Sequence, residues 1–259
     1  MNPAGFLFGP NATVNVGGMV SFTSADYLRL ANGAKFNAVP NANADALLST
    51  APVAAFGFLG SNPGAITVQG SQLTVAEGTG ISLVGGNITV QGGTLTAPSG
   101  QINLVSVGRP SNPNIGGEVA NGGEFAATGF KSLGAINLSQ GSTVDTSAIA
   151  DLTVVHSAGT VVIRGGQLVM DNSSIESILP RFARGAGGNI EVTAEEVTLS
   201  NNSRIDASAA GFTLGSPGNI TFNVQNFSAS DSTISSASRD FSCPDWWGRD
   251  DSRSAGSRR

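Results

Sequence analysis

The sequence is poor in the residues that catalysis and metal binding usually use. It has one cysteine, Cys243, one histidine, His156, and only 12% charged residues. A single cysteine excludes an intramolecular disulfide and a zinc site built from several cysteines. No serine and aspartate are placed around His156 in a pattern that indicates a catalytic triad. We therefore predict no catalytic residue, no cofactor and no metal ion.

Long apolar runs and basic clusters are also missing. No apolar run approaches the roughly 18 residues of a membrane-spanning helix. The formal net charge is −5 and no basic stripe runs through the body of the chain, which argues against a nucleic-acid partner. The first residues, Met1 to Gly5, also lack the basic and apolar regions of a signal peptide.

The chain is rich in glycine, with 35 residues, and several of these glycines begin a short phrase that is repeated along the sequence. A glycine is followed two positions later by isoleucine or valine, and the phrase returns at intervals of about 26 to 36 residues. The copies begin at Gly64, Gly100, Gly134, Gly159 (with one residue inserted), Gly188 and Gly218. A fixed period of this size is typical of stacked structural repeats.

Within a repeat, apolar and polar residues alternate with the period of a half-buried strand. The clearest case reads Asn189–Thr193, Glu196–Leu199 and Ser203–Ala207, which predicts three short strands. Short strands without helical periodicity between them predict an all-β fold, a right-handed parallel β-helix. An antiparallel sandwich, with hairpin turns at Gly85-Gly86 and Gly92-Gly93, is the alternative.

Two stretches interrupt the repeats and predict short excursions from the coil. Residues 34–63 contain a polar, turn-rich segment, and Asp45 to Leu48 reads as a short helical turn. Residues 108–128 hold a second loop. From residue 239 to 259 the strand pattern stops and both tryptophans and the cysteine appear. We interpret this tail either as a disordered linker or as a frameshifted gene end.

Three acidic residues occupy equivalent positions in successive repeats. Asp145, Glu176 and Asp206 each follow an apolar residue in a similar context, so they are expected to stack on one face. We interpret them as a solvated polar ladder. A carbohydrate-active enzyme of the β-helix type, with catalytic or cation-binding acids, is the alternative.

The opening residues carry a family resemblance. Asn2-Pro3-Ala4-Gly5-Phe6 and the Phe8-Gly9 turn resemble the Asn-Pro-Asn-Gly-Ile motif of filamentous-haemagglutinin-like exoproteins. Phe56 to Gly60 and Asn62 to Gly70 look like the same domain. Ala4 and Phe6 depart from the motif. Over residues 1–110 the chain resembles the later part of the secretion, or haemagglutination-activity, domain, and residues 111–238 resemble the repeat stalk that follows it.

The resemblance implies a secreted surface exoprotein that acts in adhesion, with a passive structural spacer as a further alternative. Its partners would be an outer-membrane β-barrel transporter of the two-partner type and a host-cell or carbohydrate ligand. By resemblance, Asn2, Pro3 and Gly5 take part in recognition by the transporter. The family carries a signal peptide and a cap before this motif, so we interpret the chain as a fragment truncated at its N-terminus, extracellular or bound to the cell surface.

Overall fold

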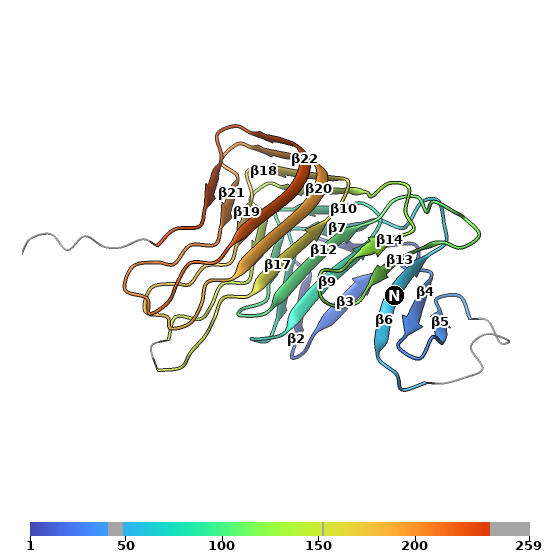
Figure 1. The fold of residues 1–259 in the computed structure, drawn as a ribbon, viewed down its shortest axis with the longest axis horizontal. Helices are drawn as coiled ribbons and strands as arrows, with labels where there is room; N and C mark the ends of the chain where they lie inside the picture. The colour runs from blue at the N-terminus through green and yellow to red at the C-terminus, as the bar shows by residue number, and fades with distance from the viewer. Residues whose placement is uncertain (41–48, 152, 239–259) are drawn as a thin grey trace, which may run out of the picture.

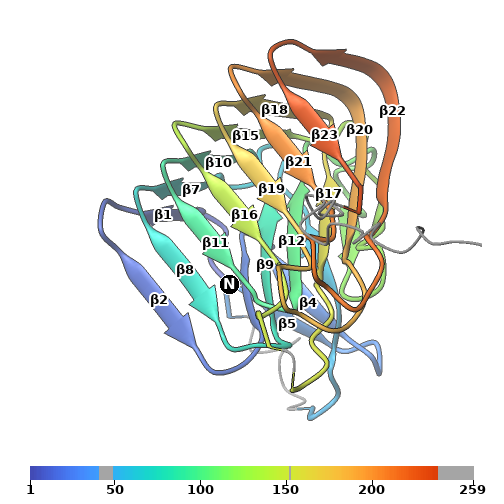
Figure 2. The same cartoon turned by 90° about the vertical axis from the view of Figure 1, so that its left-hand side faces the viewer.

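The computed structural model describes residues 1–40, 49–151 and 153–238, which form a parallel β-solenoid (Figures 1 and 2). Each turn of the coil gives one strand to each of three faces, and each strand pairs in parallel with its counterpart in the next turn. The all-β parallel architecture is confirmed, and the right hand of the coil stays a prediction. Within the described ranges, no helix is long and apolar enough to cross a membrane.

The strands fall into three faces. The first face contains β1 (Phe6–Phe8), β7 (Ile66–Gln69), β10 (Ile88–Gln91), β15 (Ala135–Ser139) and β18 (Gln167–Asp171). The second contains β2 (Thr13–Val16), β8 (Gln72–Val75), β11 (Thr94–Thr96), β16 (Thr143–Asp145), β19 (Ser174–Glu176), β21 (Arg204–Asp206) and β23 (Thr233–Ser235). The third contains β3 (Val20–Thr23), β9 (Gly80–Gly85), β12 (Gln101–Ser106) and β17 (Thr160–Arg164). The longer strands β20 (Asn189–Ser200) and β22 (Ile220–Ala229) join the third face to the first.

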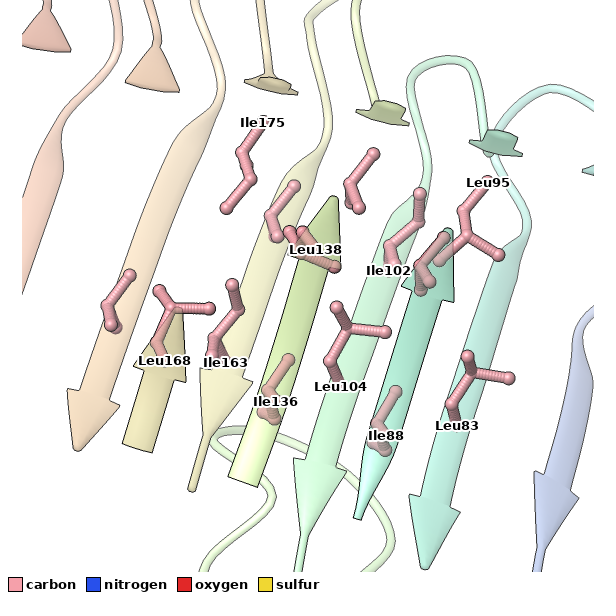
Figure 3. Packing of buried hydrophobic residues seen from close by; sticks show 14 of the residues in the cluster. Leu83, Ile88, Leu95, Ile102, Leu104, Ile136, Leu138, Ile163, Leu168 and Ile175 are labelled. Atoms are coloured by element: carbon pink, nitrogen blue, oxygen red, sulfur yellow. The ribbon is translucent and has the colours of Figure 1, made fainter. Parts of the chain in front are cut away.

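Aliphatic ladders inside the coil form the core (Figure 3). On the first face Ile66, Ile88 and Ile136 are in register and fully buried. The second and third faces carry equivalent ladders, which include Leu95 and Ile102. Full burial of such a side chain contributes about 1.5–3 kcal/mol. Because each side chain packs on its equivalent in the next turn, the core extends along the axis instead of closing around a centre.

One predicted strand boundary is wrong. The segments Asn189–Thr193 and Glu196–Leu199 are parts of the single strand β20, whose first half pairs with β17 and whose second half pairs with β18. Inward and outward residues alternate up to Ala194, and then Glu195 and Glu196 are both exposed. The alternation changes phase there because the strand bends around a corner without losing its ladder: the amides of both glutamates donate to the Gly166 carbonyl.

The glycine phrase marks two corners of each turn and not one. Gly64 and Gly134 precede first-face strands, whereas Gly100, Gly159, Gly188 and Gly218 precede third-face strands. In the second set, a Cβ added to Gly159 would lie closer than 3.0 Å to the backbone of Gly100, and one added to Gly188 would overlap the Gly159 carbonyl oxygen. Successive turns therefore touch through their backbones at this corner, and glycine is required by the lack of space.

The predicted excursions form one antiparallel sheet beside the coil (Figure 1). It contains β4 (Tyr27–Leu30), β5 (Lys35–Asn37), β6 (Val53–Phe58), β13 (Gly117–Ala120) and β14 (Ala127–Thr128). The first excursion begins earlier than predicted, at β4, and its β6 pairs with β13 of the second. The predicted helical turn at Asp45 to Leu48 and the tail 239–259 lie outside the described residues. The antiparallel sandwich is wrong for the body, since Gly85-Gly86 and Gly92-Gly93 are corners between parallel faces.

A polar contact joins the two excursions. The Tyr27 hydroxyl donates to Glu118 Oε1 at 2.9 Å, and Arg29 Nε donates to Glu118 Oε2 at 2.9 Å. The Tyr27 ring lies against Gly57, where a side chain would overlap it, and Lys35 Nζ lies 3.9 Å from the ring centroid. Burial, and to a smaller extent the hydrogen bond to Glu118, raises the pKa of Tyr27 to about 12.

This pKa shift predicts that the antiparallel sheet formed by the two excursions, the excursion sheet, loses stability at alkaline pH. A phenol whose pKa is higher in the folded state than its ordinary value of 10.0 contributes stability below pH 10, and this contribution is lost as the pH rises toward 12. Glu118 and Asp26 oppose ionisation, and Arg29 favours it. We expect the free energy of unfolding to fall across this range and to fall less in Tyr27→Phe. Since the chain has one tyrosine, tyrosinate absorbance measures the titration directly, and an ordinary pKa would contradict the prediction.

Candidate functional site

The residues predicted for transporter recognition form a tight turn at the first described turn of the coil. Asn2 Nδ2 donates to the Gly5 carbonyl at 2.8 Å, and Asn2 Oδ1 accepts from the Ala4 amide at 3.2 Å. The Gly5 amide donates to the Asn2 carbonyl at 2.9 Å. Asn2 is exposed, Pro3 is half-buried and Gly5 is buried. The structure therefore brings the three residues together in one turn whose outer edge is Asn2.

Gly5 fixes this turn against the next level of the coil. Its φ is 97°, in the region that favours glycine, and an added Cβ would overlap the Ala65 carbonyl oxygen. That oxygen accepts the Phe6 amide at 2.9 Å, which starts the pairing of β1 with β7. Gly64 in turn has no space for a side chain beside Pro3 and Gly5. Gly5 thus stacks the turn on the next level of the coil, whereas Asn2 is exposed and Pro3 is half-buried.

The turn continues into an open groove along the same corner. Asn62 and Pro63 line the groove, together with Asn87 and the exposed Arg109. Asn87 Oδ1 accepts the Ala135 amide at 3.0 Å, so its side chain bridges two levels of the coil. Asn62-Pro63-Gly64 repeats most of the opening motif one level further along. Because Gly64 packs against Pro3 and Gly5, the groove lies next to the Asn2 turn.

Beside the turn, three aromatic residues form the inner side of the first described level. The ring centroids of Phe8 and Phe22 lie 4.9 Å apart in an edge-to-face arrangement, and those of Phe6 and Phe22 lie 5.6 Å apart. All three rings are half-buried and pack on the aliphatic core. They hold β1 and β3 together, which keeps the Asn2 turn in a fixed position relative to the coil.

The acidic ladder exists, but it is not solvated throughout. Asp145, Glu176 and Asp206 are in register on the second face (Figure 2 shows their strands β16, β19 and β21 side by side). Asp206 is fully buried and paired with Arg204. Asp145 accepts the Ser147 amide and Asp206 the Ser208 amide, each at 2.8 Å. Two of the three carboxylates therefore hold the turn that follows their strand, and within the described residues no group of acids, histidines or cysteines is arranged to hold a metal ion.

His156 is placed beside an acid that sequence reasoning did not link to it. Its Nδ1 contacts the Glu77 carboxylate, which comes from the turn after β8, far earlier in the chain. No serine joins this pair in the hydrogen bonds of the described residues. The contact ties a loop of one level to a turn of another, which is a structural role.

Sequence reasoning also missed three long loops at one corner of the coil. Between β11 and β12 this corner takes residues 97–100, but between β16 and β17 it takes 146–159, between β19 and β20 it takes 177–188, and between β21 and β22 it takes 207–219. We call 177–188 and 207–219 the corner loops. Each carries an exposed phenylalanine, Phe182 or Phe212, followed three positions later by glycine. This repeated Phe-x-x-Gly spacing is the sequence signal that marks them.

One of three comparisons with known proteins finds a match, and it covers the N-terminal part of the chain. The family model described as TPS secretion domain matches residues 1–163. No curated protein and no solved structure matches the chain. The matched range includes the Asn2 turn, the groove and the excursion sheet, and it ends within β17. The domain boundary at residue 110 stays a prediction.

Proposed function

This chain belongs to the TPS secretion domain family, and from that premise we propose that the transporter binds its Asn2 turn and that its solenoid acts in adhesion. A TPS domain implies a two-partner-secretion exoprotein, which leaves the cell through an outer-membrane transporter partner. Such proteins are secreted and are extracellular or attached to the cell surface.

The observation that carries the recognition proposal is the exposed Asn2 side chain at the edge of the coil. Its turn is held by its own hydrogen bonds and by Gly5, so the side chain keeps one orientation. A pre-organised turn binds a partner without the entropic cost of ordering a loop. Pro3 adds an apolar contact beside Asn2, and the groove at Asn62 and Pro63 extends the same edge.

Export itself is proposed to use the free energy of folding. The described body has no cysteine, so no disulfide obstructs an unfolded chain in an oxidising compartment. Each turn of the coil contacts mainly its neighbours, which allows folding to proceed turn by turn as the chain emerges. Every completed turn then opposes backward movement through the pore. The stacked aliphatic ladders support this proposal because their packing requires only the preceding turn.

A catalytic role receives no support from the acidic ladder. Asp206 is buried and paired with Arg204, and Asp145 Oδ1 accepts the Ser147 amide of its own turn. We therefore propose that the protein is a non-enzymatic exoprotein. The exposed corner loops lie outside the matched family range, and we propose that they form the surface used in adhesion.

Recognition is tested by Asn2→Ala in cells that co-produce the chain and a cognate transporter of the two-partner type. We expect the secreted amount to fall about tenfold, as for the loss of roughly 1.4 kcal/mol of binding free energy. Asn32→Ala is the matched control, because Asn32 also accepts a backbone amide two positions later, at 3.1 Å, in an exposed turn. Equal secretion of the two variants, or secretion that does not depend on the transporter, would contradict the proposal.

A further inference from the structure

The groove next to the Asn2 turn is lined by a single charged residue, Arg109. Its volume is about 580 Å³, and its other lining residues are serines, asparagines, glycines and small or aliphatic apolar residues. Among the described residues that line it there is no carboxylate. Asp26 lies at the loop that leads into the groove, and its Oδ2 accepts the amides of Leu59 and Gly60 at 2.6 and 3.3 Å. The groove therefore carries a positive charge within a chain of net charge −5.

The Arg109 guanidinium has no partner within the part of the chain that the structure describes. Its side chain is exposed and takes part in none of the ion pairs there. By contrast, Arg29 pairs with Glu118 and Arg164 pairs with Glu191, so those two arginines hold parts of the fold together. The fold does not use the charge of Arg109 in this way, which leaves its donors available to a partner.

The backbone that carries Arg109 is fixed at the edge of the groove. The Gly108 amide donates to the Ser132 carbonyl at 3.1 Å, and the Lys131 amide donates to the Arg109 carbonyl at 2.8 Å. A Cβ added to Gly108 would lie 2.7 Å from the Ser132 carbonyl oxygen, so the two segments touch through their backbones. Because this attachment is rigid, a partner has to order only the Arg109 side chain and not a loop.

The donors in the groove match a carboxylate. A guanidinium presents a planar fork of N–H groups that binds both oxygens of a carboxylate in parallel hydrogen bonds. Asn87 adds a further donor, because its Oδ1 accepts the Ala135 amide at 3.0 Å and this contact orients its Nδ2 group. The carboxamide of Asn62 and the hydroxyl of Ser132 also line the groove. The groove thus offers a charged fork surrounded by neutral hydrogen-bonding groups.

We propose that Arg109 binds an acidic side chain on the periplasmic part of the transporter while the Asn2 turn is bound beside it. The inference rests on the proposed recognition function and adds the chemistry of the partner's contact. Two observations favour this occupant: the groove adjoins the Asn2 turn, and it lies within the matched family range. An anionic membrane surface fits less well, because the chain as a whole is negative. Such a charge pair adds specificity for one transporter and speeds association.

The test is the affinity of the purified full chain for the purified transporter in detergent micelles, at low and at high salt. Arg109→Gln is expected to lower the affinity at low salt at least about tenfold, through loss of a bidentate charged contact. Its affinity is also expected to depend less on salt than that of the wild type. Arg109→Lys keeps the charge without the fork and is expected to lie between the two. Arg184→Gln is the matched control: Arg184 is exposed, lies outside the groove and takes part in no ion pair of the described residues, so its loss is expected to change the affinity less than about twofold.

The outcomes separate this inference from the proposed function. Wild-type affinity in Arg109→Gln, or equal losses in Arg109→Gln and Arg184→Gln, would overturn the contact in the groove. Vesicles that contain phosphatidylglycerol are the comparison ligand, and binding to them that requires Arg109 would assign the groove to a membrane instead. If Arg109→Gln binds normally while Asn2→Ala is not secreted, only the inference fails, whereas transporter-independent secretion refutes the proposed function as well. Equal thermal midpoints of wild type and Arg109→Gln ensure that a loss of binding is not a loss of folding.

Discussion

Gly159→Ala is expected to destabilise the coil by at least about 3 kcal/mol, although it adds a single methyl group. Gly159 is buried, and its Cβ would lie closer than 3.0 Å to three backbone atoms of Gly100. The next amide, Thr160 N, donates to the Gly100 carbonyl at 2.8 Å. Backbone cannot rotate away as a side chain does, so the turns must separate and stretch this ladder. Denaturant unfolding followed by circular dichroism measures the loss.

Gly60→Ala is the matched control for this substitution. Gly60 is exposed and has no atom within 4 Å of an added Cβ. Alanine there is expected to leave the stability unchanged or to raise it by up to about 1 kcal/mol, because it restricts the unfolded chain. If both variants unfold at the same denaturant concentration, adjacent turns of the coil are not in close backbone contact at Gly159, and lack of space does not explain the glycines at this corner.

The glycine phrase also shows how far the sequence predicts the fold. Alternating apolar residues such as Ile102 and Ile190 identify inward positions, and these residues are fully buried as expected. The phrase does not reveal which corner a glycine occupies, since both corners need a small residue before a strand. Gly64 and Gly188 therefore look alike in the sequence but belong to different faces.

Features that depend on contacts between distant levels were not predictable from local pattern. Nothing near Asp206 indicates that its carboxylate is fully buried beside Arg204, because the same Ile-Asp pattern occurs on solvated strands. Likewise, β6 and β13 are far apart in the chain, and their pairing follows only from the path of the coil between them. The Asn2 turn, by contrast, is stabilised by a local hydrogen bond, so the residues Asn, Pro and Gly were enough to predict a turn there.

The double variant Ile190→Asp, Ile220→Asp is expected to stop export and leave the chain on the periplasmic side. Ile190 is fully buried between Val161 and Ile220 in the third-face ladder. Replacing it alone removes an apolar side chain and buries a carboxylate, at a cost of more than about 4 kcal/mol. That loss prevents the last turns from stacking. If stacking opposes backward movement, the chain is held in the transporter or is degraded.

Asn189→Asp with Asn219→Asp is the matched control, since it places the two carboxylates one position earlier in the chain, at the start of β20 and directly before β22. Both asparagines are exposed, and an aspartate at 189 still accepts the amide of residue 219, which Asn189 Oδ1 accepts at 3.2 Å. Like charges so placed cost less than about 1 kcal/mol, so export is expected to continue. Secreted and periplasmic fractions are compared by immunoblot, and the purified variants are unfolded in denaturant. Because the control carries the same added charge, any difference in export reports on the stacking of the core. Wild-type export of the isoleucine variant, together with its measured instability, would mean that folding outside the cell does not drive the chain through the pore.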